Sequence, residues 1–272
     1  MESLETGNPI ADSAEIAPPA AAPAPPRAPN ASYVDFLESL LVTILLALFL
    51  TTFILQAFKI PSQSMEPTLL VGDHLLVNKF IFEGNGAWYE KLLPYRPIRR
   101  GDIIVFKYPF DDHPHFVKRV IGLPDDRIRI INERVYVNGV RLAEPYVVHD
   151  PSADDPFGDN FPPSDADFPR RGLRPEWADQ IMSSVRNGEL IVPPDHFFVM
   201  GDNRNVSLDS RYWGFVDRCA IMGRPMVIYW SVEATAGDYN DRSLLGTIRG
   251  IEEGLIHLSS RTRWHRMLRE VH

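Results

Sequence analysis

Residues 127–142 read RIRIINERVYVNGVRL, and this stretch decides the fold class. Two short runs rich in β-branched residues, Arg127–Ile131 and Arg134–Val137, are separated by turn residues, as in consecutive strands. Asn138-Gly139 then lies between Val137 and Val140, and this dipeptide is typical of the type I′ turn that closes a tight hairpin. The stretch therefore predicts antiparallel strands joined by short turns.

Working outward, similar runs recur on both sides, and we predict a mainly β fold with an antiparallel β domain over residues 59–235. Residues 141–190 break the rhythm and are interpreted as a Pro/Asp-rich insertion into that domain, with a helix over Pro175–Arg186 and Gly188 just past its end. The other predicted strands are His74–Val77, Asp102–Tyr108, Phe116–Ile121, Phe197–Met200 and Met226–Trp230.

The 20 residues Ser39–Phe58 carry no charge and match the length of a membrane-spanning helix. We predict one transmembrane anchor over residues 35–58, preceding the β domain. A cleaved signal sequence and a buried core helix are the alternatives, but the apolar run is long, distant from the start and without a polar stripe. The Pro- and Ala-rich residues 1–34 are predicted to be a disordered tail.

The charges near the span give a weak cue to its orientation. Arg27 precedes it, whereas Lys59 and Lys79 follow it, so the positive-inside rule would place the following domain in the cytoplasm. Residues 236–272 form a tail in which Arg261, Arg263, His265, Arg266 and Arg269 alternate with Trp264, Met267 and Leu268. This pattern resembles a basic amphipathic helix on a membrane surface, with an ordinary surface helix as the equal alternative.

Composition limits the classes of function. The net charge is −8, which disfavours an electrostatic nucleic-acid binder. The single cysteine, Cys219, cannot form an intramolecular disulfide, and we expect it to be a small buried side chain. His113 and His115 could chelate a metal, but without a carboxylate partner we interpret them as surface residues and expect no metal site. No Gly-x-Ser-x-Gly or His-Glu-x-x-His motif is present.

The segment after the anchor places Ser62 and Ser64 between Pro61 and Pro67. A serine needs a base to become a nucleophile. Of the five lysines, Lys118 stands out, because strand alternation puts it on one face with Phe116 and Val120. Burial among apolar neighbours lowers a lysine pKa and supplies neutral amine, as a general base requires. A snorkelling lysine with a solvated head group is the alternative.

A third polar segment, residues 201–214, follows an apolar strand and is dense in Asp, Asn, Arg and Ser. Such a composition favours hydrogen bonds and ion pairs that stiffen a loop supporting a site, although a polar turn with one salt bridge would look similar.

Together these segments resemble the signature boxes of type I signal peptidases, in the right order. The resemblance covers about residues 35–231, excluding most of 141–190. The matching motifs are Pro-Ser-x-Ser-Met-x-Pro-Thr-Leu at 61–69, Gly-Asp and Val-Asn-Lys-Phe within 72–80, Arg-Gly-Asp-Ile-Ile-Val-Phe at 100–106, Lys-Arg-Val-Ile-Gly-Leu-Pro at 118–124, and Gly-Asp-Asn-Arg with Ser-x-Asp-Ser-Arg-Tyr-Trp-Gly at 201–214.

The resemblance implies a membrane-bound serine endopeptidase that removes signal peptides from exported preproteins after Ala-x-Ala-like sites, without a cofactor. It also implies a bacterial plasma membrane location with residues 59–272 outside the cytoplasm, against the charge cue. Its partners would be preproteins and the lipid bilayer, with the secretion translocon as a candidate, and no nucleic acid. The implied residues are Ser64 as nucleophile, Lys118 as base, Ser62 and the Ser64 N–H as the oxyanion hole, Ser207, Asp202, Asp209 and Arg211 as support, and Phe58, Ile60, Pro61, Met65 and Phe116 near the substrate.

Two departures from the family pattern stand out. Asp125 replaces the glycine of Leu-Pro-Gly-Asp, and since glycine permits a positive φ we expect this turn to adjust. Val206 replaces the asparagine before Ser207. Two other functions remain as alternatives: another Ser-Lys peptidase, such as a self-cleaving repressor, and a catalytically dead membrane scaffold. The anchor argues against the first and the intact serines and lysine against the second.

Overall fold

The computed structural model describes most of the chain, and the segments it describes are residues 31–82, 95–108, 115–150, 152, 153, 155, 160–163, 175–233 and 261–272. Residues 1–30, for which we predict disorder, lie outside the described residues, as does the Pro- and Asp-rich stretch 164–174. The chain divides into two units, residues 1–46 and residues 47–272, which are described separately below.

An apolar helix begins the described chain. α1 (Ala31–Phe49) is followed by a π-helical turn, Leu50–Ile54, and the residues Tyr33–Ile54 are long and apolar enough to cross a membrane, with a mean hydropathy of 2.3. The helix differs at both ends from the range 35–58 predicted for the anchor. The helix already includes residues 31–34, and residues 55–58 leave it to form a strand, because their backbone groups pair with a neighbouring strand instead.

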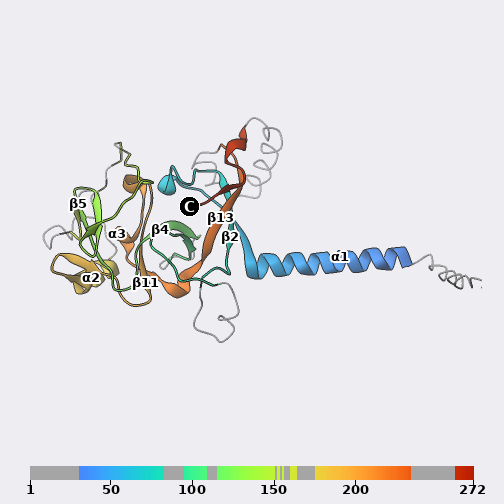
Figure 1. Ribbon diagram of the computed structural model, residues 1–272, viewed down its shortest axis with the longest axis horizontal. Coiled ribbons are helices and arrows are strands. Elements are labelled where there is room, and N and C mark those ends of the chain that lie inside the picture. The colour runs from blue at the N-terminus through green and yellow to red at the C-terminus, as the bar shows by residue number, and fades with distance from the viewer. Residues whose placement is uncertain are drawn as a thin grey trace, which may run out of the picture. The chain divides into compact units, whose positions relative to one another are not determined.

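The prediction of a mainly antiparallel β fold is confirmed, because all neighbouring strands in the two sheets described below are antiparallel. Among the described residues, eight strands form the first sheet, in the order β1-β2-β13-β3-β4-β11-β12, with β14 beside β13. Figure 1 shows β13, β2, β4 and β11 in this part of the domain. Its strands are β1 (Leu55–Lys59), β2 (Asp73–Asn78), β3 (Ile103–Phe106), β4 (Phe116–Gly122), β11 (His196–Met200), β12 (Val216–Asp217), β13 (Ile221–Ser231) and β14 (Arg269–Glu270).

The hairpin that opened the sequence analysis belongs to a second sheet. Asn138 and Gly139 both have positive φ, 54° and 78°, as a type I′ turn requires. In the described part of the chain this sheet has six strands, in the order β7-β6-β5-β10-β9, with β8 beside β5. Its strands are β5 (Arg127–Ile131), β6 (Arg134–Val137), β7 (Val140–Arg141), β8 (Asn160–Phe161), β9 (Val185–Arg186) and β10 (Glu189–Ile191).

The insertion is integrated into this second sheet. The predicted helix over 175–186 ends two residues early, as α2 (Pro175–Ser184), because Val185 and Arg186 begin β9. Gly188 is not a helix cap: Asn187 and Gly188 have φ of 55° and 74° and turn β9 into β10. Trp177 and Ile181 of α2 are buried in one hydrophobic cluster with the strands, so α2 covers the sheet that contains β5 (Figure 1).

Residues 261–272 do not form the basic amphipathic helix that their sequence resembles. Trp264–Arg266 is one 3₁₀ turn, and β14 pairs with β13 through Val227–Glu270 and Ile228–Arg269. The reason is burial: Val271 joins the core, and the side chain of Arg266 is buried against that of Asp73, so these residues are tied to the β domain. The other residues of the predicted tail, 236–260, lie outside the described residues.

Two smaller expectations need correction. The turn at Asp125 keeps a left-handed φ of 67° although the residue is not glycine. The following carboxylate holds this turn, because Asp126 accepts hydrogen bonds from Leu123 N at 2.6 Å and Asn138 Nδ2 at 2.7 Å. Cys219 is exposed rather than buried, since it lies in the 3₁₀ turn Arg218–Ala220 at the surface.

Candidate active site

Ser64 lies in a 3₁₀ turn, Gln63–Met65, in the connection between β1 and β2. Pro61 precedes this turn, and Met65 and Leu69 anchor it in the hydrophobic cluster below, where both are fully buried. The Ser64 side chain is itself buried, at 6% exposure. The nucleophile predicted from the sequence is therefore held by apolar neighbours on a short, rigid turn.

Lys118 approaches Ser64 from β4. Its Nζ is 2.6 Å from Ser64 Oγ, within hydrogen-bond distance, although the two residues are 54 positions apart in the sequence. Burial lowers the pKa of Lys118 to about 8, even though Asp209 and Asp202 act to raise it. On the same face, the Phe116 ring centroid lies 5.6 Å from Nζ, as the strand alternation predicts. The snorkelling alternative is excluded, because the side chain is buried at 4% exposure.

The polar loop 201–214 packs against this pair. Asn203 N donates to Ser64 O at 3.2 Å, and Gly201 N donates to Asp209 Oδ2 at 3.1 Å. Arg211 binds Asp209 through Nε at 2.8 Å and Nη2 at 2.9 Å. Burial acts to raise the pKa of Asp209, but the Arg211 charge and its hydrogen bonds outweigh it, so the pKa is lowered. The loop therefore keeps a buried carboxylate ionised near Lys118.

Ser207 lies in this loop but does not make the contact that the family resemblance implies. Its hydroxyl is buried and helps to lower the pKa of Asp209, and among the described residues it makes no hydrogen bond to the Lys118 amine. Val206, the departure from the family pattern, ends the 3₁₀ turn Arg204–Val206 just before it.

Sequence reasoning assigned Asp202 to the site but missed its partners. Arg119 binds both Asp202 oxygens, at 2.8 and 2.7 Å, and Thr68 Oγ1 donates to Oδ2 at 2.6 Å. The Arg119 guanidinium also lies 3.9 Å from the centre of the Tyr146 ring. This network joins β4, the loop and the segment after the nucleophile. A signal was present in the sequence, because Arg119 follows Lys118 directly and so reaches the opposite face of the same strand.

The proposed oxyanion donors are near each other but loosely arranged. Ser62 is exposed, and its Oγ is 3.4 Å from Ser64 Oγ. Ser64 lies in the first turn of the 3₁₀ segment, where backbone N–H groups lack partners within the turn itself. Both groups are hydrogen-bond donors within two residues of the Ser64 hydroxyl.

The predicted substrate-contacting residues divide into covered and accessible groups. Ile60 and Met65 are buried in the cluster beneath the turn, with Phe58 packed against it. Pro61 is exposed, and Phe116 is half-buried. Of the histidine pair considered as a metal chelate, His113 lies outside the described residues, and the His115 ring packs edge-on against Phe58, 5.0 Å between centroids.

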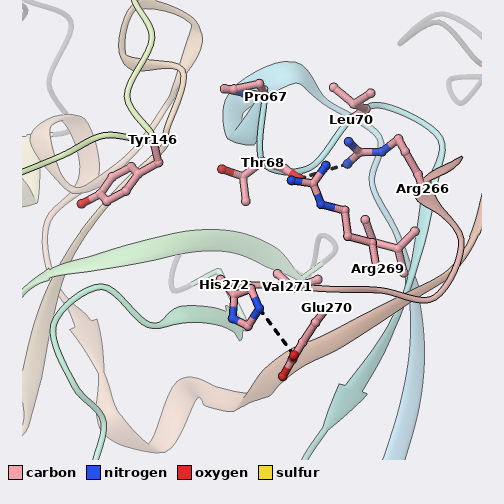
Figure 2. A pocket seen from close by; sticks show the side chains of 10 residues that line it. Pro67, Thr68, Leu70, Tyr146, Arg266, Arg269, Glu270, Val271 and His272 are labelled. Atoms are coloured by element: carbon pink, nitrogen blue, oxygen red, sulfur yellow. Dashed lines mark hydrogen bonds and ion pairs between the residues drawn. The ribbon is translucent and has the colours of Figure 1, made fainter.

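A cavity of about 520 Å³ lies beside the Asp202–Arg119 network, lined by Thr68, Tyr146 and residues 269–272 among others (Figure 2). Figure 2 shows Arg266 beside it, donating to the Thr68 carbonyl oxygen at 3.0 Å. Neither Ser64 nor Lys118 lines this cavity.

Comparison with known proteins agrees with this geometry. The family model described as signal peptidase, peptidase S26, matches residues 33–230. A probable signal peptidase I-2 from Synechocystis is 33% identical over 75% of this chain and 76% of the relative. Signal peptidase I from Pseudomonas aeruginosa is 34% identical over 73% of this chain and 72% of the relative. A crystal structure of a signal peptidase I from Enterococcus faecalis V583 is 27% identical, with a TM-score of 0.31, over 47% of this chain and 97% of that one.

The range that the family model matches, residues 33–230, includes the apolar helix Tyr33–Ile54 and most of the antiparallel β domain that follows it. The chain therefore belongs to the signal peptidase family, peptidase S26, and is a serine endopeptidase.

Proposed function

We propose that this enzyme removes signal peptides from exported preproteins with Ser64 as nucleophile and Lys118 as general base. The observation that carries the proposal is the 2.6 Å contact between Lys118 Nζ and Ser64 Oγ, made where both side chains are buried. The names of the curated relatives support the substrate class. We assign to the catalytic domain the predicted residues 59–235 together with the rest of β1, from Leu55, and residues 261–272, which pack against it.

The reaction follows from the positions of these atoms. Ser64 Oγ attacks the scissile carbonyl carbon while the neutral Lys118 amine takes its proton. The Ser64 N–H and the Ser62 hydroxyl stabilise the negative oxygen of the tetrahedral intermediate. The Lys118 ammonium then gives the proton to the leaving amine, which leaves an acyl ester on Ser64. Water then attacks the acyl carbon while the neutral Lys118 amine takes its proton, and the ammonium returns that proton to Ser64 Oγ as the acyl product leaves. These steps use no metal or organic cofactor.

An extended peptide would bind along the outer edge of β1. Among the described strands, β1 lies at one end of the first sheet and pairs with β2, and an edge strand of this kind can accept a further strand. Alternate side chains of a peptide strand point to the same face, and two shallow sites would favour small residues at the first and third positions before the cut. We infer an Ala-x-Ala-like cleavage site, with Phe58, Ile60, Pro61, Met65 and Phe116 near the substrate.

The location proposed is a bacterial plasma membrane, spanned once by Tyr33–Ile54, with the catalytic domain on the extracytoplasmic side. The span has the required length and hydropathy. It ends about ten residues before Ser64, so chain connectivity keeps the nucleophile within roughly 35 Å of the span. Substrates held in the same bilayer would reach it, and the translocon that delivers them is a candidate partner.

The direct test is cleavage of a preprotein by the purified full-length enzyme in detergent, followed by N-terminal sequencing of the product. We expect one new N-terminus, immediately after an Ala-x-Ala site, and its loss when the last Ala is replaced by a large residue. Absence of cleavage, or cleavage at unrelated positions, would contradict the proposed function. A matched preprotein with the site intact but the signal peptide's apolar run disrupted serves as the control for substrate recognition.

The pH dependence should report the lysine. Lys118 acts as a base only when neutral, and its pKa is lowered to about 8 by burial. Activity should therefore be low at pH 6, rise through pH 8 and reach a plateau above it. The measurement is kcat/KM across this range, with circular dichroism at each pH to show that the enzyme stays folded. A maximum near pH 5 would rule out an amine as the base.

The Ser62 hydroxyl offers a second test of the site. Ser62→Ala should lower kcat by about 10²–10³-fold, as removal of one oxyanion donor does in comparable enzymes, while KM changes little. Gln63→Ala, in the same turn and exposed, is the matched control and should keep its activity. Initial rates over a range of preprotein concentrations separate kcat from KM, and equal rates for the two variants would exclude Ser62 from the oxyanion hole.

A further inference from the structure

The first part of the insertion runs alongside the polar loop of the active site. We call residues 144–155 the strap; residues 151 and 154 are outside those described. Val148 N donates to Asp202 O at 3.0 Å, and Arg204 N donates back to Val148 O at 3.0 Å. His149 Nδ1 lies 3.0 Å from Asn205 Oδ1. The strap therefore follows the loop over several residues instead of touching it at one point.

Two acidic side chains of the strap bind the two arginines of the loop. Glu144 accepts from Arg204 Nη2 at 2.5 Å and from Nη1 at 3.3 Å. Asp155 accepts from Arg211 Nη1, and its other oxygen accepts from Tyr212 Oη at 2.6 Å. The side chains of Asp155 and Arg211 are both only 1% exposed. Without Glu144, Arg204 would keep a buried charge with no carboxylate bound to it among the described residues, and Arg211 would lose one of the two carboxylates that bind it, so both pairs favour the docked strap.

The contact with Asp155 continues to the reacting atoms. Arg211, held by Asp155, also binds Asp209 through two nitrogens, and Asp209 accepts from Gly201 N at 3.1 Å. Gly201 in turn packs against the nucleophile, since a Cβ added there would lie 2.4 Å from Ser64 O. The sequence of contacts thus runs from the strap, through Arg211 and Asp209, to the backbone of Ser64.

We propose that Asp155 is a positioning residue of the active site, which holds Arg211 so that the polar loop stays packed over Lys118 and keeps water from its amine. Glu144 acts in the same way on Arg204. This inference rests on the proposed function only for its kinetic test, because the packing itself is independent of the substrate. It assigns a role to the insertion, which the family motifs leave out.

If the polar loop is loosened, the pKa of the Lys118 amine should change. The charged groups facing the Lys118 amine are Asp209, Asp202 and Arg211, and burial is the largest cause of its low pKa. Admitting water would therefore raise the pKa toward the ordinary value of 10.5. Removing the negative charge of Asp155 should by itself lower the pKa of Lys118, but it acts on the amine only through Arg211. We therefore expect the rise in pKa caused by hydration to be the larger effect.

The kinetic test compares Asp155→Asn with Asp150→Asn in the full-length enzyme. Asp150 lies in the same strap, and in the described part of the chain its carboxylate bonds only to Ser152. Asp155→Asn should lower kcat at pH 8 about fivefold, as a rise in pKa from about 8 to about 9 would, with KM unchanged and activity recovering near pH 10. Asp150→Asn should match the unchanged enzyme. Equal profiles for both variants, or a loss that persists at pH 10, would overturn the proposal.

A second measurement needs no substrate. Reaction of the Lys118 amine with acetic anhydride, followed across pH by mass spectrometry, reports its pKa directly, so a failure of the proposed cleavage activity cannot be confused with a failure of the strap. We expect a midpoint near 8 in the unchanged enzyme and a higher one in Asp155→Asn. Should that variant not fold, Tyr212→Phe removes one donor to Asp155 and should give a smaller shift of the same sign. An unchanged midpoint in the folded variants would refute the role of Asp155.

Discussion

Lys118→Ala should abolish preprotein cleavage, with a fall in kcat of at least about 10⁴-fold, as loss of one member of a catalytic dyad or triad does elsewhere. The reason is that the amine is 2.6 Å from Ser64 Oγ and is the group placed to take its proton. Initial rates of preprotein cleavage, detected by the shortened product on a gel, measure the effect. The enzyme should remain folded, because alanine leaves no unpaired charge in the buried site.

Lys118→Arg is the informative companion to that variant. Arginine keeps the positive charge and much of the length, but its guanidinium stays protonated and cannot serve as a base. It should therefore be as inactive as Lys118→Ala. Lys107→Ala, at an exposed lysine near the end of β3, is the matched control and should retain activity. Substantial cleavage by either Lys118 variant would show that another group activates Ser64.

Asp73→Ala should produce the largest loss of stability, about 3–5 kcal/mol, because it leaves the buried Arg266 guanidinium without its carboxylate. Asp73 is fully buried and also accepts from Ser231 Oγ at 2.6 Å and from Leu70 N at 2.9 Å. For a domain of this size the midpoint of thermal unfolding should fall by about 10 °C. Thermal unfolding followed by circular dichroism in detergent measures this change.

Two further variants make the ion-pair explanation testable. Arg266→Ala combined with Asp73→Ala should cost less than the sum of the two single changes, because the double variant has no unpaired buried charge. Arg261→Ala, at an exposed arginine of the same segment, should change the free energy of unfolding by less than about 0.5 kcal/mol. Strict additivity of the two buried substitutions would show that Asp73 and Arg266 stabilise the fold independently.

Local patterns were sufficient to predict much of the fold. The alternation in Arg127–Ile131 and Arg134–Val137 and the Asn138-Gly139 turn appear in the structure where they were predicted. These features depend on neighbouring residues, which the sequence contains in full. The end of the apolar helix was missed, because Leu55–Phe58 carry no charge, like the residues before them, and become a strand only through pairing with β2.

The same distinction applies to the candidate site. Apolar neighbours in the strand marked Lys118 as a buried lysine, and this prediction needed only the period of β structure. Arg119 was overlooked, because its importance comes from Asp202, which is 83 positions away. The supporting role of Glu144 and Asp155 was also beyond a local reading, since an acidic, Pro-rich segment has the composition of a surface loop.

By itself, the sequence determined the class of the fold and the apolar span, because strand alternation, turn chemistry and hydropathy act over a few residues. Its motifs indicated Ser64 and Lys118 as the candidate nucleophile and base only through their resemblance to a known family. Only the tertiary structure decided that residues 261–272 pack as a strand and a turn against β13, that the insertion joins the second sheet, and that Asp155 reaches Arg211. These contacts depend on which buried charges meet in the folded chain, and the residues next to a charged side chain in the sequence do not indicate its partner.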